Sequence, residues 1–123
     1  FDNEIKSWPL YFTPKILSSS NKKVFYIGDA FNGFLPTLAQ GAGQSIESAY
    51  EIFNLLKENK LDMDTYFKLR SKRAKIVRKR SNLNFFTFHL SNSLIQNIRN
   101  IILKFLVKRK KFIEGYLGKV YEN

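Results

Sequence analysis

The chain has 123 residues, a net charge of +11 and a mean hydropathy of −0.29. It holds no cysteine and a single histidine, His89, so disulfides, thiolate metal sites and cysteine nucleophiles are excluded. A histidine metal site and a Ser-His-Asp triad would need more than this one imidazole, and we expect neither a metal site nor a catalytic side chain in the chain.

The length suits one small domain with a single core. Because the sequence begins at Phe1 rather than Met, we expect a piece of a longer protein. We identify no signal peptide, and no apolar run reaches the roughly 20 residues that cross a bilayer. These features predict a cytoplasmic location, with peripheral membrane contact as an alternative.

The excess of positive charge lies in the second half of the chain. Residues 1–59 carry five basic and six acidic side chains, a net charge of −1, whereas residues 60–123 carry sixteen and four, a net charge of +12. The first half therefore has the balance of an ordinary folded domain. The second half produces a field that attracts phosphate, anionic lipid or an acidic partner.

The first elements in chain order are predicted to be extended. The apolar and aromatic residues of Ile5–Phe12 include Pro9, which suits an edge strand or a connection. A polar loop follows over Lys15–Lys23. The β-branched and aromatic run Val24–Ile27 has no polar alternation, which predicts a strand buried on both faces. Ala30–Ala42 contains too much Gly and Pro for a regular element.

Helices are predicted for the rest of the chain. Apolar residues at helical spacing indicate a helix from about Gly43 to Leu56. A second helix is expected to start after a cap at Asp62 or Asp64 and to end near Arg80. A broad apolar stripe over Leu94–Leu106 predicts a third helix, which Ser91, Asn92 or Ser93 would cap and which four basic residues at 108–111 would close. Another short helical turn is expected within 112–121.

The segment from Val24 to Glu51 holds the most informative pattern. A strand would deliver one fixed carboxylate, a glycine-rich turn would let the backbone approach a ligand, and a helix N-terminus would direct its free N–H groups at negative charge. The residues that supply these features are Gly28, Asp29, Pro36, Gly41, Ala42 and Gly43.

In this order and spacing the segment resembles the second flavin-binding motif of the group A FAD-dependent aromatic monooxygenases, the p-hydroxybenzoate and salicylate hydroxylase family. The resemblance covers Trp8 to about Phe53, and it is strongest at Ile27–Ala30 and Pro36–Glu47. It implies an α/β fold: the C-terminal fragment of a Rossmann-like FAD-binding domain with one or two strands, followed by three to four helices. Residues 1–15 would return from the substrate domain, 16–59 would bind FAD, and 60–123 would form a basic helical region.

The same resemblance implies a role for each motif residue. Asp29 would accept a hydrogen bond from a ribityl hydroxyl of FAD, and Gly28 would let the chain pass close to it. Pro36 would line the flavin face. The helix start, Gly41–Gly43, would place the N–H groups of Ala42 and Gly43 on the pyrimidine edge of the isoalloxazine.

The chain departs from the family pattern at two places. Phe31-Asn32 replaces the common Ala-His pair, and Ser48 replaces the aspartate that often follows the helix glutamate. We still expect these residues to bind flavin, because Asp29 and the helix start are present. The two departures put in doubt the loop that shapes the substrate side of the pocket. The family's N-terminal GxGxxG is not in this chain, so we expect residues 1–123 alone to hold FAD poorly and to be inactive.

The resemblance thus implies an NAD(P)H- and FAD-dependent monooxygenase that hydroxylates or epoxidises an aromatic or lipid-soluble polyprenyl or quinone-type substrate. Its partners would include the remaining N-terminal part of the FAD and substrate domains. A reductase or a halogenase stays open within the family. The alternative of another class is a non-enzymatic basic amphipathic module that binds membrane surfaces.

The basic second half allows three interpretations. Its positive charge forms a solvated face on a packing helix, or contacts anionic lipid through the apolar stripe and the cluster at 108–111, or binds nucleic acid. We favour the first and do not expect nucleic-acid binding, because no recognisable nucleic-acid module accompanies the charge.

Overall fold

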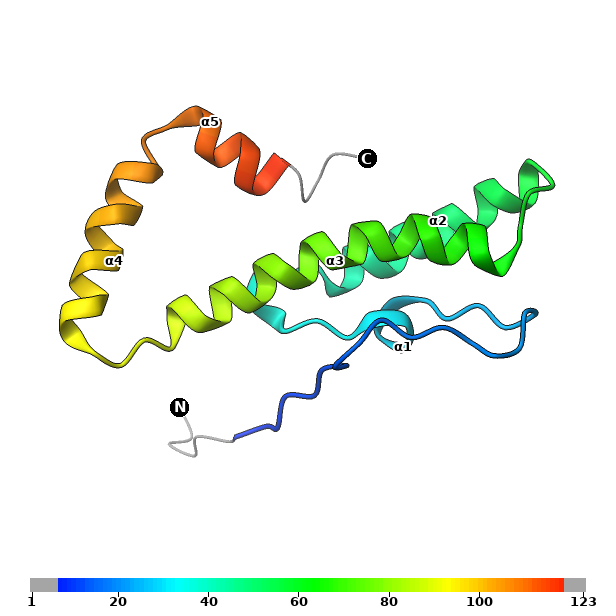
Figure 1. Cartoon of the computed structure of the whole chain (residues 1–123), viewed down its shortest axis with the longest axis horizontal. Coiled ribbons are helices and arrows are strands. Elements are labelled where there is room, and N and C mark those ends of the chain that lie inside the picture. The colour runs from blue at the N-terminus through cyan, green and yellow to red at the C-terminus, as the bar shows by residue number, and fades with distance from the viewer. Residues whose placement is uncertain (1–6, 119–123) are drawn as a thin grey trace, which may run out of the picture.

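A computed structural model describes residues 7–118, and helices dominate this part of the chain (Figure 1). An extended N-terminal segment leads into a pair of adjacent helices, beyond which the chain turns away and then returns. The elements in order are α1 Gly28–Asn32, the 3₁₀ turn η1 Pro36–Leu38, α2 Gly41–Lys57, α3 Met63–Phe88, α4 Ser93–Leu106, α5 Lys110–Ile113 and the π turn η2 Glu114–Gly118.

Helices α2 and α3 form an antiparallel pair, and α1 and η1 pack against it (Figure 1). α2 ends where Asn59 takes a left-handed conformation, with φ of 54°. The side chain of Asp62 then caps α3 by accepting hydrogen bonds from the backbone N–H groups of Asp64 (2.9 Å) and Thr65 (3.0 Å). These local signals make the tight turn between the two helices.

The core lies where the extended segment and α1 pack against this helix pair. Tyr66 of α3 is fully buried, and its hydroxyl donates to the main-chain oxygen of Tyr26 at 2.8 Å. The ring of Tyr66 meets Phe25 and Phe31 edge to face, with centroids 5.5 Å and 5.8 Å away. Aromatic packing therefore holds the N-terminal segment on α3.

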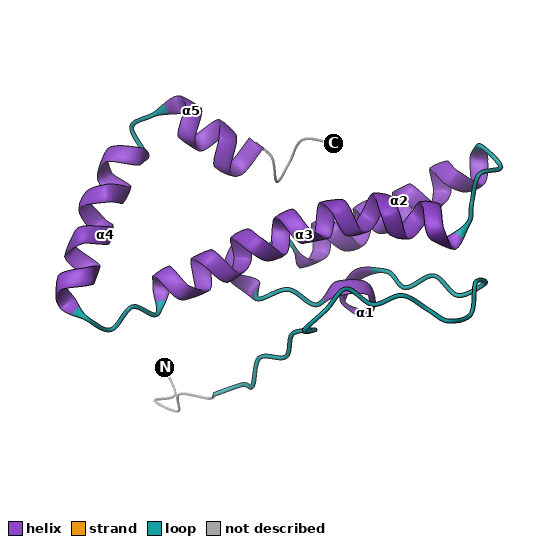
Figure 2. Cartoon of the chain, in the orientation of Figure 1, coloured by secondary structure: helices purple, strands orange, loops and turns teal. Residues whose placement is uncertain are grey.

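The α/β prediction is wrong: Figure 2 shows helices and loops but no strand between residues 7 and 118. The run 24–27 is not assigned as a strand, because a strand requires a neighbour that pairs with its N–H and C=O groups and none does so among the described residues. The run instead packs through Phe25 and Tyr26 beside Tyr66. The edge strand expected over 5–12 is absent from 7–12, and its first two residues lie outside the described part.

The main helices were predicted from the sequence, with differences at their ends. α2 and α4 match the expected ranges, and Asn92, one of three candidate caps, accepts from the N–H groups of Leu94 and Ile95. α3 begins as expected but runs eight residues past Arg80 to Phe88. The loop expected over 30–42 contains two short helical turns, and residues 119–121 of the last predicted turn lie outside the described part.

Beyond α3 the chain leads away from the helix pair along α4 and turns back along α5 (Figure 1). None of the residues of α4 is buried. After α5 the chain contacts α3 again: Arg80 donates to the main-chain oxygen of Gly115 (2.8 Å) and lies over the ring of Tyr116 (5.0 Å). None of the described helices is long and apolar enough to cross a membrane.

Candidate functional site

Gly28 forms a sharp corner that lies directly on α2. Its φ of +55° is left-handed, and an added Cβ would stand 2.6 Å from the Oγ of Ser45 in the first turns of α2. Both the conformation and the close approach require glycine. The predicted Gly-Asp turn and the glycine-rich helix start are therefore neighbours in space.

Asp29 follows this corner in the first turn of α1. Its side chain is exposed, and within residues 7–118 no hydrogen bond or ion pair engages its carboxylate. A carboxylate that follows a corner packed on α2 but is left without a partner in the described part of the chain is available to a ligand with hydroxyl groups.

The loop that contains Pro36 is fixed to the C-terminal third of α3. Pro36 opens η1 and is exposed, whereas Thr37 donates from its hydroxyl to the main-chain oxygen of Ser81 (2.7 Å). Asn84 donates to the main-chain oxygen of Thr37 at 3.2 Å, and Ser81 donates to the main-chain oxygen of Leu35. Pro36 is thus an exposed ring on an anchored loop.

The N-terminus of α2 follows Ala39, which is left-handed with φ of 52°. No side chain caps this helix start, in contrast to α3 and α4. Ala42 is exposed, and an added Cβ at Gly41 would meet nothing within 4 Å. The first N–H groups of α2 are consequently open to an acceptor outside the described residues.

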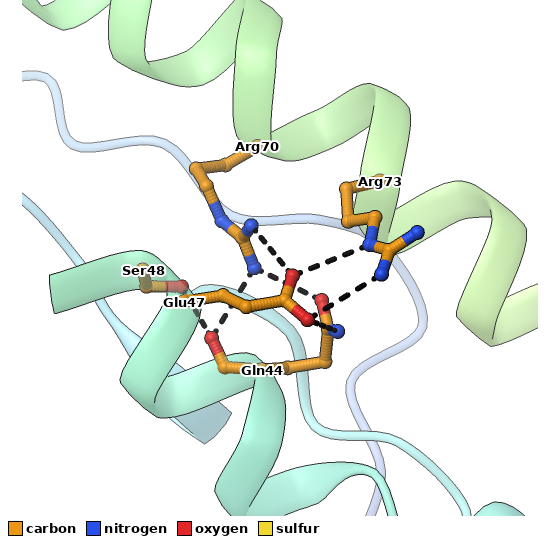
Figure 3. A network of polar contacts seen from close by, with 5 residues as sticks. All are labelled: Gln44, Glu47, Ser48, Arg70 and Arg73. Atoms are coloured by element: carbon orange, nitrogen blue, oxygen red, sulfur yellow. Dashed lines mark hydrogen bonds and ion pairs between the residues drawn. The ribbon is translucent and has the colours of Figure 1, made fainter. Parts of the chain in front are cut away.

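A polar network locks this end of α2 to α3 (Figure 3). Arg70 donates to Oε2 of Glu47 (3.1 Å), to Oε1 of Gln44 (2.9 Å) and to the main-chain oxygen of Gln44 (3.2 Å). Arg73 also contacts Glu47, at 3.2 Å. Only 6% of the Arg70 side chain is exposed. The network therefore sets the position of the α2 N-terminus from within the helix pair.

Glu47 is ionised within this network. Burial alone would raise the pKa of its carboxyl, but hydrogen bonds from Arg73 and Arg70, together with their positive charges, outweigh burial and lower the pKa below its usual 4.5. The carboxylate is a structural anion and is already committed to two guanidinium groups.

The two residues that depart from the family pattern at 31–32 face inward. Phe31 is buried against Phe67, with ring centroids 6.0 Å apart. Asn32 is buried as well, and neither polar atom of its side chain has a hydrogen-bond partner in the described part of the chain. At least Phe31 thus serves packing of the core.

The basic face of α3 is only partly the solvated face that the sequence predicts. The lysines are exposed at Lys68, Lys72, Lys75 and Lys79. Several arginines instead make specific contacts inside the protein: Arg70 binds α2, and Arg78 donates to the main-chain oxygen of Pro14 at 2.9 Å. The distinction follows from the planar guanidinium, which donates in several directions at once.

The groups that hold the motif residues in position are not predicted from the sequence. In the sequence Glu47 belongs to the resemblance, and Arg70 is one of the many basic residues of 60–123. The available signal was that Glu47 and Gln44 share one face of α2, three residues apart, while Arg70 and Arg73 share one face of α3 in the same way. Nothing in their spacing reveals that the two faces meet.

Comparison with known proteins identifies partial matches to monooxygenases and a hydroxylase. The chain is 32% identical over 97 residues to 3-amino-4-hydroxybenzoate 2-monooxygenase PtmB3 of Streptomyces platensis, and 31% identical over 97 residues to PtnB3, which carries the same enzyme name in that organism. It is 32% identical over 80 residues to hispidin-3-hydroxylase of Neonothopanus nambi. No family model matches the chain, and no solved structure matches it.

These alignments cover 76% and 60% of this chain but only 24% and 19% of the relatives. The chain thus spans about a quarter of the length of the curated relatives that it matches. At this coarse level it is similar to oxidoreductases of the monooxygenase and hydroxylase type.

Proposed function

We propose that this chain supplies the flavin-contacting segment of an FAD-dependent monooxygenase of the group A type. The complete protein would use NAD(P)H and O2 to hydroxylate or epoxidise an aromatic or lipid-soluble polyprenyl or quinone-type substrate. The observation that carries the proposal is the contact between the Gly28 corner and the first turns of α2, which brings the turn that bears the unpaired Asp29 against a helix whose start no side chain caps.

The chemistry of these groups suits FAD. The Asp29 carboxylate can only accept hydrogen bonds, and the ribityl chain of FAD offers hydroxyl donors. The N–H groups of Ala42 and Gly43 can only donate, and the pyrimidine edge of a flavin offers acceptors. The partial positive charge of the α2 N-terminus would stabilise negative charge on that edge.

Bound FAD would supply the transfer of electrons and oxygen, and the residues of this chain would bind and orient it. Pro36, on its anchored loop, would limit access to one flavin face. The network around Arg70 would keep the α2 N-terminus aligned. The rest of the FAD and substrate domains would come from the remaining N-terminal part of the protein.

A spectrum of the full-length protein tests the proposal. Purified protein is expected to be yellow, with flavin absorbance bands, and to oxidise NAD(P)H in a substrate-stimulated reaction. Residues 1–123 alone are expected to hold FAD poorly and to show no turnover. A full-length protein that is colourless and gains no absorbance band from added FAD would contradict the proposal, and vesicle binding by that colourless protein would favour the non-enzymatic alternative.

A further inference from the structure

The exposed apolar face of α4 is the largest feature that the flavin proposal leaves unused. The apolar residues of this face run along one side of α4, a helix of 14 residues that is about 21 Å long at 1.5 Å per residue. They are Leu94, Ile95, Ile98, Ile101, Ile102 and Phe105, all exposed. We call them the α4 stripe. Leu94 is 71% exposed and Ile101 70%, so in the described structure no other element covers the stripe.

Positive charges predominate around the α4 stripe, and the first acidic residue after it, Glu114, pairs with Lys110 at 3.6 Å. Residues 65–113 contain fourteen basic side chains and no acidic one. Four of them, Lys108, Arg109, Lys110 and Lys111, follow the stripe directly and are exposed. The guanidinium of Arg109 lies 4.3 Å from the ring centroid of Phe105, which places a cation at the edge of the apolar stripe.

The exposed apolar residues of α2 have a different setting. Ile46 is 71% exposed, as is Leu94, but residues 24–56 contain no basic side chain and three acidic ones, Asp29, Glu47 and Glu51. Charge complementarity therefore distinguishes the two faces. An anionic surface would be attracted by the basic residues of α4 and would find no basic residue in the sequence around Ile46.

We propose that α4 is an interfacial helix that binds the surface of an anionic lipid bilayer. The α4 stripe enters the boundary between headgroups and acyl chains, while the cluster at 108–111 contacts anionic headgroups. The amide-rich opposite side of α4, with Asn97 and Asn100, stays in water. This inference does not depend on flavin binding.

Vesicle sedimentation with the full 123-residue chain tests the proposal. The chain is expected to bind phosphatidylcholine vesicles that contain phosphatidylserine, to bind pure phosphatidylcholine vesicles far more weakly, and to be released by salt. Failure to bind the anionic vesicles would overturn the proposal. A concentration-dependent dimer that does not bind vesicles would instead assign the stripe to a second copy of the chain.

Two pairs of matched variants distinguish binding through α4 from non-specific adsorption to vesicles. Replacing residues 108–111 with four Gln is expected to weaken partitioning of the chain onto anionic vesicles about 100-fold. The same change at the exposed Lys68, Lys72, Lys75 and Lys79 is expected to weaken it far less. Ile101→Asn is expected to weaken this partitioning about tenfold. Ile46 is equally exposed, and Ile46→Asn is expected to leave the partitioning unchanged. Equal effects within either pair would overturn the proposal.

A depth measurement keeps the proposal testable if a variant folds poorly. Because the native chain has no cysteine, Ile98→Cys and Asn100→Cys can each carry a single nitroxide. Two residues apart on a helix, they lie on opposite sides of α4. The label at 98 is expected to be shielded from aqueous relaxants on vesicles and the label at 100 to stay accessible. Equal accessibility would overturn the proposal.

Discussion

Arg70 of α3 donates to both the side-chain and the main-chain oxygen of Gln44 in the first turns of α2. An almost fully buried guanidinium thereby binds the backbone of α2 as well as one of its side chains. The helix start proposed to face FAD is consequently positioned by α3, an element whose sequence resembles an ordinary basic helix.

Replacing Arg70 with Met is expected to lower the free energy of unfolding by about 3 kcal/mol, because Gln44 and Glu47 would lose a buried, charged donor. Urea unfolding followed by circular dichroism measures the change. The exposed pair of Lys60 and Glu58 is the control, and Lys60→Gln is expected to leave stability unchanged. Equal effects of the two changes would show that the Arg70 network does not stabilise the helix pair.

The lowered pKa of Glu47 predicts a defined dependence of stability on pH. Its ionised form is favoured in the folded state, so its contribution is complete above the usual pKa of 4.5 and is lost as the pH falls below that value. Unfolding measured between pH 7 and pH 3 should therefore show a steeper acid loss in the native chain than in Glu47→Gln. Parallel curves for the two proteins would contradict this assignment.

Gly28 and Gly41 offer a matched test of the corner. Gly28→Ala is expected to cost about 1–3 kcal/mol of stability, because alanine strains a left-handed φ and its Cβ meets Ser45. Gly41→Ala, in the first turn of α2 with open space around it, is expected to be neutral or slightly stabilising. Thermal unfolding of both variants checks this. Similar melting temperatures would mean that the corner tolerates a side chain.

The sequence predicts the elements whose signals are local. Asp62 and Asn92 cap helices where capping residues are expected, and the apolar spacing of α2 and α4 gives their extents. Gly28 is recognisable as a turn residue for the same reason. These features depend on a few neighbouring residues.

The errors concern properties that depend on distant residues. The run 24–27 has strand-like composition, but strand formation needs a pairing partner. In the described part the main-chain oxygen of Tyr26 instead accepts a hydrogen bond from the hydroxyl of Tyr66. The burial of Arg70 depends on Gln44 and Glu47, which precede it by 26 and 23 residues. Such pairings appear only once α2 and α3 are packed.

FAD affinity of the Asp29→Asn variant, measured by fluorescence titration of the full-length protein, tests the account most directly. The matched control is Asp64→Asn, because Asp64 also lies exposed in the first turn of a helix. Loss of a hydrogen bond to a charged acceptor is expected to raise the Kd for FAD about tenfold or more in Asp29→Asn and to leave it unchanged in Asp64→Asn. An unaltered Kd in Asp29→Asn, with the fold intact, would contradict the assignment of this corner to FAD.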